Sequence, residues 1–354
     1  MQTDGTRTAR PAEADDLDLR NGELVEVLSE QEILATLDER GRLEALPFMP
    51  EMLQYAGRRF RVGKVASKVC DQVKHSGNYR MERTVHLEGL RCDGQAHGGC
   101  QAGCLLYWKH AWLRRVEPGA PSSNGQAPAP APVAEALAAE APGGGPPPCT
   151  LAALREATRA EPFEDGQERF SCQATELPRA WTTHIRAWDP RPYVRDVLSG
   201  NAGLWQTVRG VLALLFNKYQ KASRRLPRPL RIHGGASYPF VDGAHDKKTP
   251  KQLLDLQPGE LVEVKSRQEI FQTLDQGGHN RGLRFDVEGL RYCGQRARVL
   301  RRVNRLIDEK TGRMINIPGD CIVLDGVVCA ADWHQNCPRG IYEFWREIWL
   351  RRVE

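Results

Sequence analysis

The sequence predicts an α+β protein with two homologous small, mainly antiparallel β-barrel-like domains, joined by a Pro/Ala/Gly linker and a helical central segment. Residues 22–117 and 259–354 match at a constant offset of 237 positions, with 37 identities over 96 gap-free residues. A stretch rich in proline, alanine and glycine follows the first copy. The remaining interval has apolar residues at helical spacing, which differs from the short alternating runs of the repeats.

The duplication is clearest at its two ends. Residues 22–27 (Gly-Glu-Leu-Val-Glu-Val) return as residues 259–264, and residues 112–117 (Trp-Leu-Arg-Arg-Val-Glu) return as residues 349–354. A period this long, with unrelated sequence between the copies, indicates two domains rather than a stack of short units. We therefore predict a first domain at 21–117 and a second at 256–354.

The segments outside the repeats differ from them in composition and periodicity. Residues 1–20 are polar and acidic without periodicity, which predicts a disordered tail. Residues 118–148 cannot bury enough apolar surface to fold, so we expect a flexible linker. Residues 149–255 are expected to be mainly helical, with one helix from Asp189 to Leu198 and a second over about 204–223. The apolar stripe of the second helix is expected to pack on the protein's own core.

Each repeat has the pattern of a small antiparallel barrel. In the second copy, residues 308–312 (Asp-Glu-Lys-Thr-Gly) and the pair Asp325-Gly326 are favoured turn sequences between short apolar runs. Residues 348–353 are expected to form the last strand. This strand pattern resembles the Src-homology-type small barrels, and the resemblance is confined to each repeat. It implies a fold and no particular function.

Composition limits the class of protein. Hydrophobic residues at 40% and charged residues at 27% are typical of a soluble globular chain, and a net charge of +5 allows an anionic partner without requiring one. No secretory signal and no apolar stretch long enough to span a membrane are visible in the sequence. We therefore expect a cytoplasmic protein whose ten cysteines are mostly reduced, so that clustered cysteines indicate metal binding or catalysis before disulfides.

The first repeat contains the strongest chemical motif. Cys92, His97, Cys100 and Cys104 lie within thirteen residues, and four glycines between them allow the backbone to turn tightly. Thiolate and imidazole are the ligands that zinc prefers, and four such donors complete a tetrahedral site. The sequence therefore predicts a metal site, with zinc as the favoured ion.

The second repeat keeps three of these four positions as Cys329, His334 and Cys337, whereas Ile341 replaces Cys104. Cys321 precedes Cys329 by eight residues, and a hairpin at Asp325-Gly326 would bring the two together. We therefore expect Cys321 to complete the second site, which gives up to two zinc ions per chain.

Several cysteines and histidines leave alternatives open. Cys70, His86 and Cys172 are candidates to join the first site, although unrelated core positions are the simpler interpretation for each. If Cys172 lies beside Cys92, Cys100 and Cys104, four thiolates are available for an iron–sulfur cluster.

Two functions agree with these motifs. The first is a metal-binding, two-repeat protein that acts as a binding or scaffold module for a protein or nucleic-acid partner. The alternative is a metalloenzyme of a biosynthetic pathway, which would use a Cys/His-ligated zinc, iron or iron–sulfur centre in the first repeat on a small-molecule substrate. The sequence has no phosphate-binding loop, nucleophile elbow, HExxH helix or dinucleotide fingerprint, so it nominates no catalytic residue.

Overall fold

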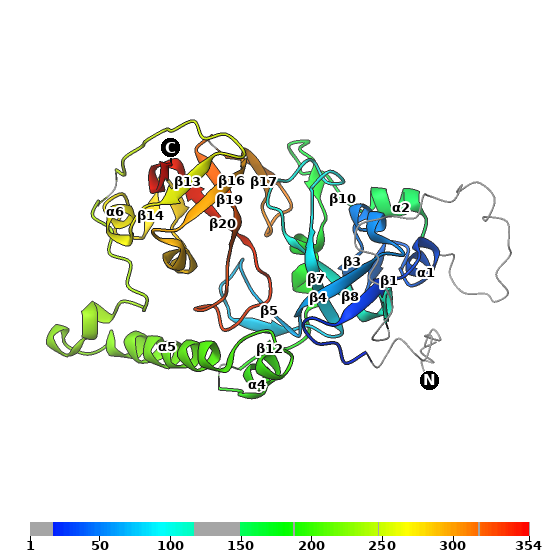
Figure 1. Cartoon of the computed structure of the whole chain (residues 1–354), viewed down its shortest axis with the longest axis horizontal. Coiled ribbons are helices and arrows are strands. Elements are labelled where there is room, and N and C mark those ends of the chain that lie inside the picture. Colours follow the sequence, from blue (N-terminus) through cyan, green and yellow to red (C-terminus); the bar gives the residue numbers. More distant parts are fainter. Residues whose placement is uncertain (1–16, 117–148, 187, 247, 318, 354) are drawn as a thin grey trace.

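The computed structural model describes residues 17–116, 149–186, 188–246, 248–317 and 319–353. It is a mixed α+β structure with two curled antiparallel half-barrel sheets, one in each repeat (Figure 1). The expected tail up to residue 16 and the expected linker at 118–148 lie outside the described residues.

The two five-stranded sheets have the same strand order. The first runs β8-β7-β4-β1-β9 and the second β20-β19-β16-β13-β21. Their registers also match, because Leu24 pairs with Arg61 and the equivalent Leu261 pairs with Arg298. The first sheet consists of β1 (Leu24–Val27), β4 (Arg59–Val65), β7 (Thr84–Arg91), β8 (Leu105–Lys109) and β9 (Leu113–Arg115). The second consists of β13 (Leu261–Val264), β16 (Arg296–Arg302), β19 (Cys321–Val328), β20 (Tyr342–Arg346) and β21 (Leu350–Arg352).

Short elements recur in the same places. Ser29 and Ser266 begin equivalent helices with a capping box, in which the serine side chain and a glutamate three residues later cap each other's backbone amides. The matched helices are α1 (Glu30–Ala35) and α6 (Arg267–Phe271), η2 (Pro50–Tyr55) and η6 (Val287–Tyr292), and η3 (His110–Trp112) and η7 (Glu347–Trp349). The remaining strands of the repeats are β2 (Arg42–Leu43), β3 (Leu46–Pro47), β5 (Lys68–Cys70), β6 (Asn78–Arg80), β14 (His279–Asn280), β15 (Leu283–Arg284), β17 (Arg305–Ile307) and β18 (Met314–Asn316).

Tryptophans form the centre of each core. Trp112 and Trp349 are fully buried, and their indole N–H groups donate to Thr36 and Thr273 at 3.0 and 2.9 Å. Phe48 meets Trp112 edge-on with ring centroids 5.0 Å apart, and the equivalent pair in the second repeat is separated by 5.3 Å. The identical residues of the two copies therefore make the same contacts in both cores.

The central segment is attached to the first repeat. Its strand β12 (His184–Ile185) pairs with β6, and Gln173 at the start of α3 (Gln173–Ala180) bonds the backbone of Tyr107 and Pro47. The predicted helices are present as α4 (Arg191–Leu198) and α5 (Leu204–Ser223). The other elements are α2 (Leu151–Glu156), β10 (Arg159–Ala160), β11 (Arg169–Phe170), η4 (Arg228–Leu230) and η5 (Ile232–Gly235).

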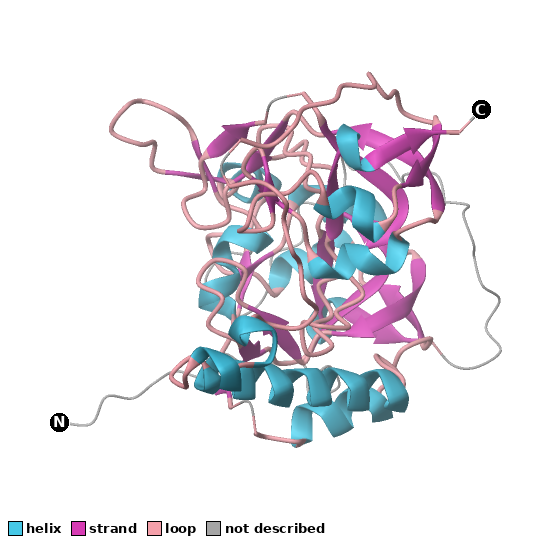
Figure 2. Ribbon diagram, turned by 90° about the vertical axis from the view of Figure 1, so that its left-hand side faces the viewer, coloured by secondary structure: helices cyan, strands magenta, loops and turns pink. Residues whose placement is uncertain are grey.

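The packing predicted for α5 is wrong. Its apolar stripe is exposed, with Trp205 at 78% and Leu212 at 60% of full exposure, while Thr207 and Gln220 are buried. These polar side chains are fixed by hydrogen bonds: Thr207 accepts from Asn336 at 2.9 Å, and Gln220 donates to two backbone carbonyls. In Figure 2 this long helix runs along the lower edge of the molecule. In the described part of the chain, no helix is long and apolar enough to cross a membrane.

One of the two predicted hairpins forms and the other does not. β17 and β18 pair around the turn at 308–312, as predicted. Asp325-Gly326, however, lies inside the continuous strand β19, where the register with β20 shifts between Val323 and Val328. Gly326 has a φ of +70°, so its left-handed conformation produces a bulge that bends the strand instead of a turn that reverses it.

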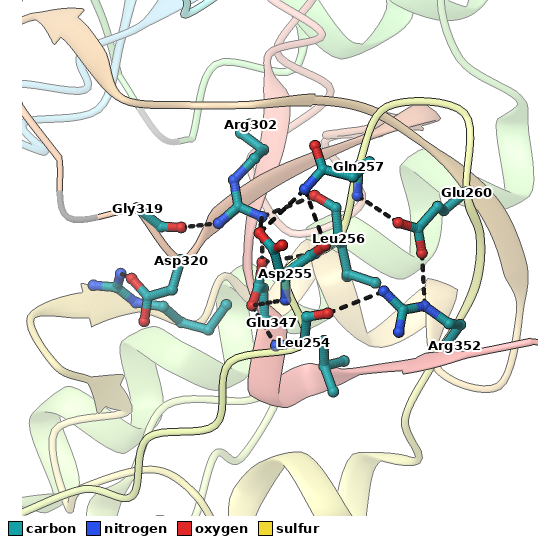
Figure 3. Close-up of polar contacts among 11 residues, drawn as sticks. Leu254, Asp255, Leu256, Gln257, Glu260, Arg302, Gly319, Asp320, Glu347 and Arg352 are labelled. Atoms are coloured by element: carbon teal, nitrogen blue, oxygen red, sulfur yellow. Dashed lines mark hydrogen bonds and ion pairs between the residues drawn. The ribbon is translucent and has the colours of Figure 1, made fainter.

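The chain enters the second repeat through a buried carboxylate. Glu347 is fully buried and accepts the backbone amides of Leu254, Asp255 and Leu256 at 2.6, 3.1 and 3.2 Å (Figure 3). Arg302 forms an ion pair with the same carboxylate at 2.7 Å. The approach of residues 254–256 to β13 is therefore fixed by charge-assisted hydrogen bonds.

Candidate metal centres

The Cys/His motifs lie in equivalent loops. Residues 92–104 connect β7 to β8, and residues 329–341 connect β19 to β20. Gly94, Gly98 and Gly99 adopt left-handed φ values of 70–74°, and the residues at the equivalent positions, Ala331, Gln335 and Asn336, adopt values of 55–59°. The loop conformation is therefore retained in the second repeat, although none of the three equivalent residues is glycine, which adopts it without strain.

The first loop brings Cys92 and His97 to Glu51, which comes from η2. The ligand atoms of these three residues all lie within 4.8 Å of one another. Cys92 Sγ is 3.3 Å from His97 Nε2 and donates to Glu51 Oε1 at 3.3 Å, and His97 Nδ1 is 3.9 Å from the same oxygen. Among the described residues, His97 Nδ1 and Glu51 Oε2 are buried without a hydrogen-bond partner. A bound cation would compensate for this burial of polar atoms.

Burial sets the electrostatics of this first triad. It raises the pKa of Glu51 and of the Cys92 thiol, and it lowers the pKa of His97 to about 4. The charged form of each group is thus disfavoured by its surroundings. A divalent cation stabilises the thiolate and the carboxylate, and it binds the imidazole in its neutral form. Metal binding is therefore expected to release protons from the thiol and the carboxyl group.

The second loop makes the equivalent triad with Glu288, from η6. Glu288, Cys329 and His334 also place their ligand atoms within 4.8 Å of one another. Cys329 Sγ is 3.5 Å from His334 Nδ1, which is 3.8 Å from Glu288 Oε1. In contrast to Glu51, Glu288 accepts the backbone amides of Asp332 and Trp333 at 3.1 and 2.7 Å. The His334 side chain is 32% exposed, so the second triad is the more open of the two.

The first loop also converges with Cys172, at the N-terminus of α3. Cys92, Cys100, Cys104 and Cys172 line one cavity of about 40 Å³, together with His97 and Ile307. The pKa values of Cys104 and Cys172 are raised to about 12, chiefly by burial and in smaller part by neighbouring cysteines. Among the described residues, the groups of three or more candidate ligand atoms that all lie within 4.8 Å of one another are the two Glu–Cys–His triads, so no three of these four sulfurs are that close together.

The structure therefore brings together the predicted residues of the first site, Cys92, His97, Cys100 and Cys104, around one cavity. In the second repeat, Cys329 and Cys337 belong to one buried cluster, with His334 beside Cys329. The prediction for Cys321 is wrong. It begins β19, whereas Cys329 follows the end of this strand, and it packs with Val303 and Val323 in a separate cluster.

The three further candidates for the first site, Cys70, His86 and Cys172, lie in three different parts of the structure. Cys172 lines the first cavity, and Cys70 lies against Cys337 of the second repeat. His86 is buried in β7, where its Nδ1 donates to the carbonyl of Leu106 at 3.0 Å and burial lowers its pKa to about 3. The position of His86 is therefore explained by packing within the sheet.

Sequence reasoning missed Glu51 and Glu288. Both residues occupy the same position in the two repeats, and this identity is the signal that could have found them. Glutamate is also commonly retained on solvated surfaces, so the signal becomes specific only when the fold buries both carboxylates beside a thiol and an imidazole.

No family model, no curated protein and no solved structure matches this chain. Its function is therefore inferred from the chemistry of the two sites.

Proposed function

We propose that this chain is a zinc-binding protein that holds one ion in each repeat and uses the two repeats as a scaffold for a partner. The observation that carries the proposal is the recurrence of one Glu–Cys–His triad at equivalent positions, in which the thiol faces Nε2 of His97 in the first repeat and Nδ1 of His334 in the second. The thiol–imidazole distances are 3.3 and 3.5 Å, and the imidazole–carboxylate distances are 3.9 and 3.8 Å. Sulfur, imidazole nitrogen and carboxylate oxygen are all zinc ligands, and Cys100 and Cys337 offer a further thiolate near each triad.

A scaffold role agrees with the surroundings of the triads. Small half-barrels bury little apolar surface, and a metal ion that crosslinks a loop to a helix compensates for a modest core. The exposed apolar stripe of α5, which includes Trp205 and Leu212, supports a protein as the partner in preference to a nucleic acid.

Metal analysis of protein purified without chelator tests the proposal. We expect about two zinc ions per chain, with Cys92→Ser and Cys329→Ser each losing one. Cys293→Ser is the matched control, because Cys293 is a half-buried thiol outside both triads, and it should retain both ions. A wild-type chain that binds no zinc when zinc is supplied would overturn the proposal.

The four-thiol cavity favours a second candidate, an iron–sulfur centre in the first repeat, which would make the chain a metalloenzyme. Cys92, Cys100, Cys104 and Cys172 line one cavity, and together they supply the four thiolates that such a cluster needs.

Anaerobic purification separates the two candidates. The cluster predicts a brown protein that contains iron and sulfide, and it predicts that Cys172→Ser and Cys104→Ser both abolish the visible absorbance. The zinc site predicts a colourless protein whose zinc content is unchanged by Cys172→Ser, because Cys172 is outside the Glu51–Cys92–His97 triad.

A further inference from the structure

The two repeats insert equivalent strand ends into each other's Cys/His loop. Cys70 and Ile307 are the last residues of β5 and β17 and occupy equivalent positions. The amide of Cys70 donates to Cys337 Sγ at 3.3 Å, and the amide of Ile307 donates to Cys100 Sγ at 3.4 Å. Because Cys100 and Cys337 are also equivalent, the two contacts are related by an approximate two-fold axis, as in an isologous dimer.

The two contacts differ in the side chain that is inserted. Ile307 contributes an apolar group to the first cavity, which already has four thiols. Cys70 instead places its sulfur 2.8 Å from Cys337 Sγ, and it packs against the buried cluster of Cys329, Ala331 and Cys337. The Gln72 side chain donates to Cys70 Sγ at 3.2 Å, as expected for a support of a thiolate ligand.

We infer that Cys70 is a ligand of the second metal centre, so that Cys70, Cys329, Cys337 and His334 hold one zinc ion between the two repeats. This inference rests on the proposed zinc binding and adds a ligand from the other repeat. Three thiolates and one imidazole are a common structural zinc set. This set keeps Cys329 and His334 of the triad, and Cys70 and Cys337 take the place of Glu288 on the ion. Glu288 remains beside His334 and accepts the backbone amides of Asp332 and Trp333.

This ligand set also accounts for a difference between the repeats. The second loop has Ile341 at the position of Cys104, and it lacks a counterpart of Cys172 among the residues of its cluster. Cys70 supplies the missing thiolate from outside the repeat. The zinc ion then connects β5 of the first repeat to the loop of the second, so its removal should weaken the contact between the repeats.

Competition for zinc with a chromophoric chelator tests the inference on the full chain. We expect Cys70→Ser to lower the affinity of one of the two zinc ions by at least about tenfold and to leave the other unchanged. Cys70→His, which restores a ligand, should recover part of this loss, whereas a role in packing alone predicts no such recovery. Cys293→Ser is the control thiol and should bind both ions as the wild type does.

A measurement on the wild-type chain avoids variants that fail to fold. Alkylation mapped by mass spectrometry should show Cys70, Cys329 and Cys337 protected together in the presence of zinc and reactive together after chelation. Cys70 alkylation at the same rate with and without zinc would overturn the inference, as would two zinc ions of unchanged affinity in Cys70→Ser. An oxidised Cys70–Cys337 pair, seen as a 2 Da loss in the zinc-loaded protein, would do so too. A wild-type chain without zinc would instead refute the proposed function itself.

Discussion

The guanidinium group of Arg91 is hydrogen-bonded to Gly340, and through it the first repeat holds the Cys/His loop of the second. Arg91 Nη2 donates to the carbonyl of Gly340 at 2.9 Å, while Nη1 donates to the carbonyl of Gly103 at 2.8 Å. Gly103 and Gly340 are equivalent positions, so one side chain bonds the same turn of both loops. The guanidinium also lies over the Tyr342 ring, 4.0 Å from its centroid.

Arg91→Ala should therefore loosen the contact between the repeats. Two hydrogen bonds from a charged donor and one cation–π contact are removed, so we expect a loss of about 2–3 kcal/mol in the free energy of unfolding, measured with urea. Arg114→Ala is the control, because Arg114 forms only exposed ion pairs with Glu26 and Glu32 and should lose at most about 0.5 kcal/mol. Equal losses in the two variants would contradict the role given to Arg91.

Lys68→Ala should be strongly destabilising. Lys68 and Asp196 form a fully buried ion pair that joins β5 to α4. Burial raises the pKa of Asp196, and the Lys68 charge opposes this, so removal of Lys68 leaves a carboxyl with no compensating cation. The expected loss is about 3–5 kcal/mol in the free energy of unfolding.

A double variant checks the cause of this effect. Lys68→Met combined with Asp196→Leu removes both charges and should recover most of the stability lost by Lys68→Ala. If the double variant is as unstable as the single one, the ion pair with Asp196 is not the source of the loss, and the contact of the Lys68 ammonium with the Tyr193 ring, 4.8 Å from its centroid, is the alternative.

Ala331→Gly should stabilise the second Cys/His loop. Ala331 has a φ of +59°, a conformation that glycine adopts without penalty, and the equivalent residue of the first repeat is Gly94. We expect a gain of about 1 kcal/mol in thermal or urea unfolding. The reverse change, Gly94→Ala, should be clearly destabilising, since its Cβ would lie 2.0 Å from the carbonyl oxygen of Cys100. A neutral Gly94→Ala would show that Gly94 does not adopt this left-handed conformation against the carbonyl of Cys100.

Acid should destabilise the first repeat through its buried histidines. Burial lowers the pKa of His86 to about 3, below the value of about 6.5 expected in the unfolded chain. Between these values the unfolded state binds more protons, so the free energy of unfolding falls as the pH falls. For His86 alone, the loss from pH 7 to pH 5 is about 2 kcal/mol.

The variant His86→Val isolates this contribution, because valine occupies the equivalent position 323. The decrease in unfolding free energy between pH 7 and pH 5 should be about 2 kcal/mol smaller in this variant than in the wild type. His97 and His110, whose pKa values burial lowers to about 4, account for part of the remaining acid sensitivity. An unchanged pH dependence would show that His86 is not buried in its neutral form.

The sequence was sufficient to predict the two antiparallel sheets and the approach of Cys92, His97, Cys100 and Cys104 to one cavity. These predictions depend on local residue patterns and on identity between the two copies, and both can be read directly from the sequence. Gly326 shows where such reasoning ends. A left-handed glycine suits a turn or a bulge equally well, and only the continuation of β19 beside β20 distinguishes them.

The placement of candidate ligands from distant segments could not be predicted for a similar reason. Glu51, Cys172 and Cys70 reach their sites from η2, α3 and β5, and their positions depend on how these elements pack. The exposed face of α5 is a second case. Apolar periodicity indicates an amphipathic helix, but the hydrogen bonds of Thr207 and Gln220 decide which face is buried.

The reciprocal insertion of β5 and β17 has a consequence for the history of the gene. Two copies that fold separately are free to drift apart or to be lost one at a time. Here the loop of each copy is lined by a residue of the other, at Cys70 and Ile307. Deletion of either copy would remove part of the site in the survivor, so selection on one site preserves both halves of the chain.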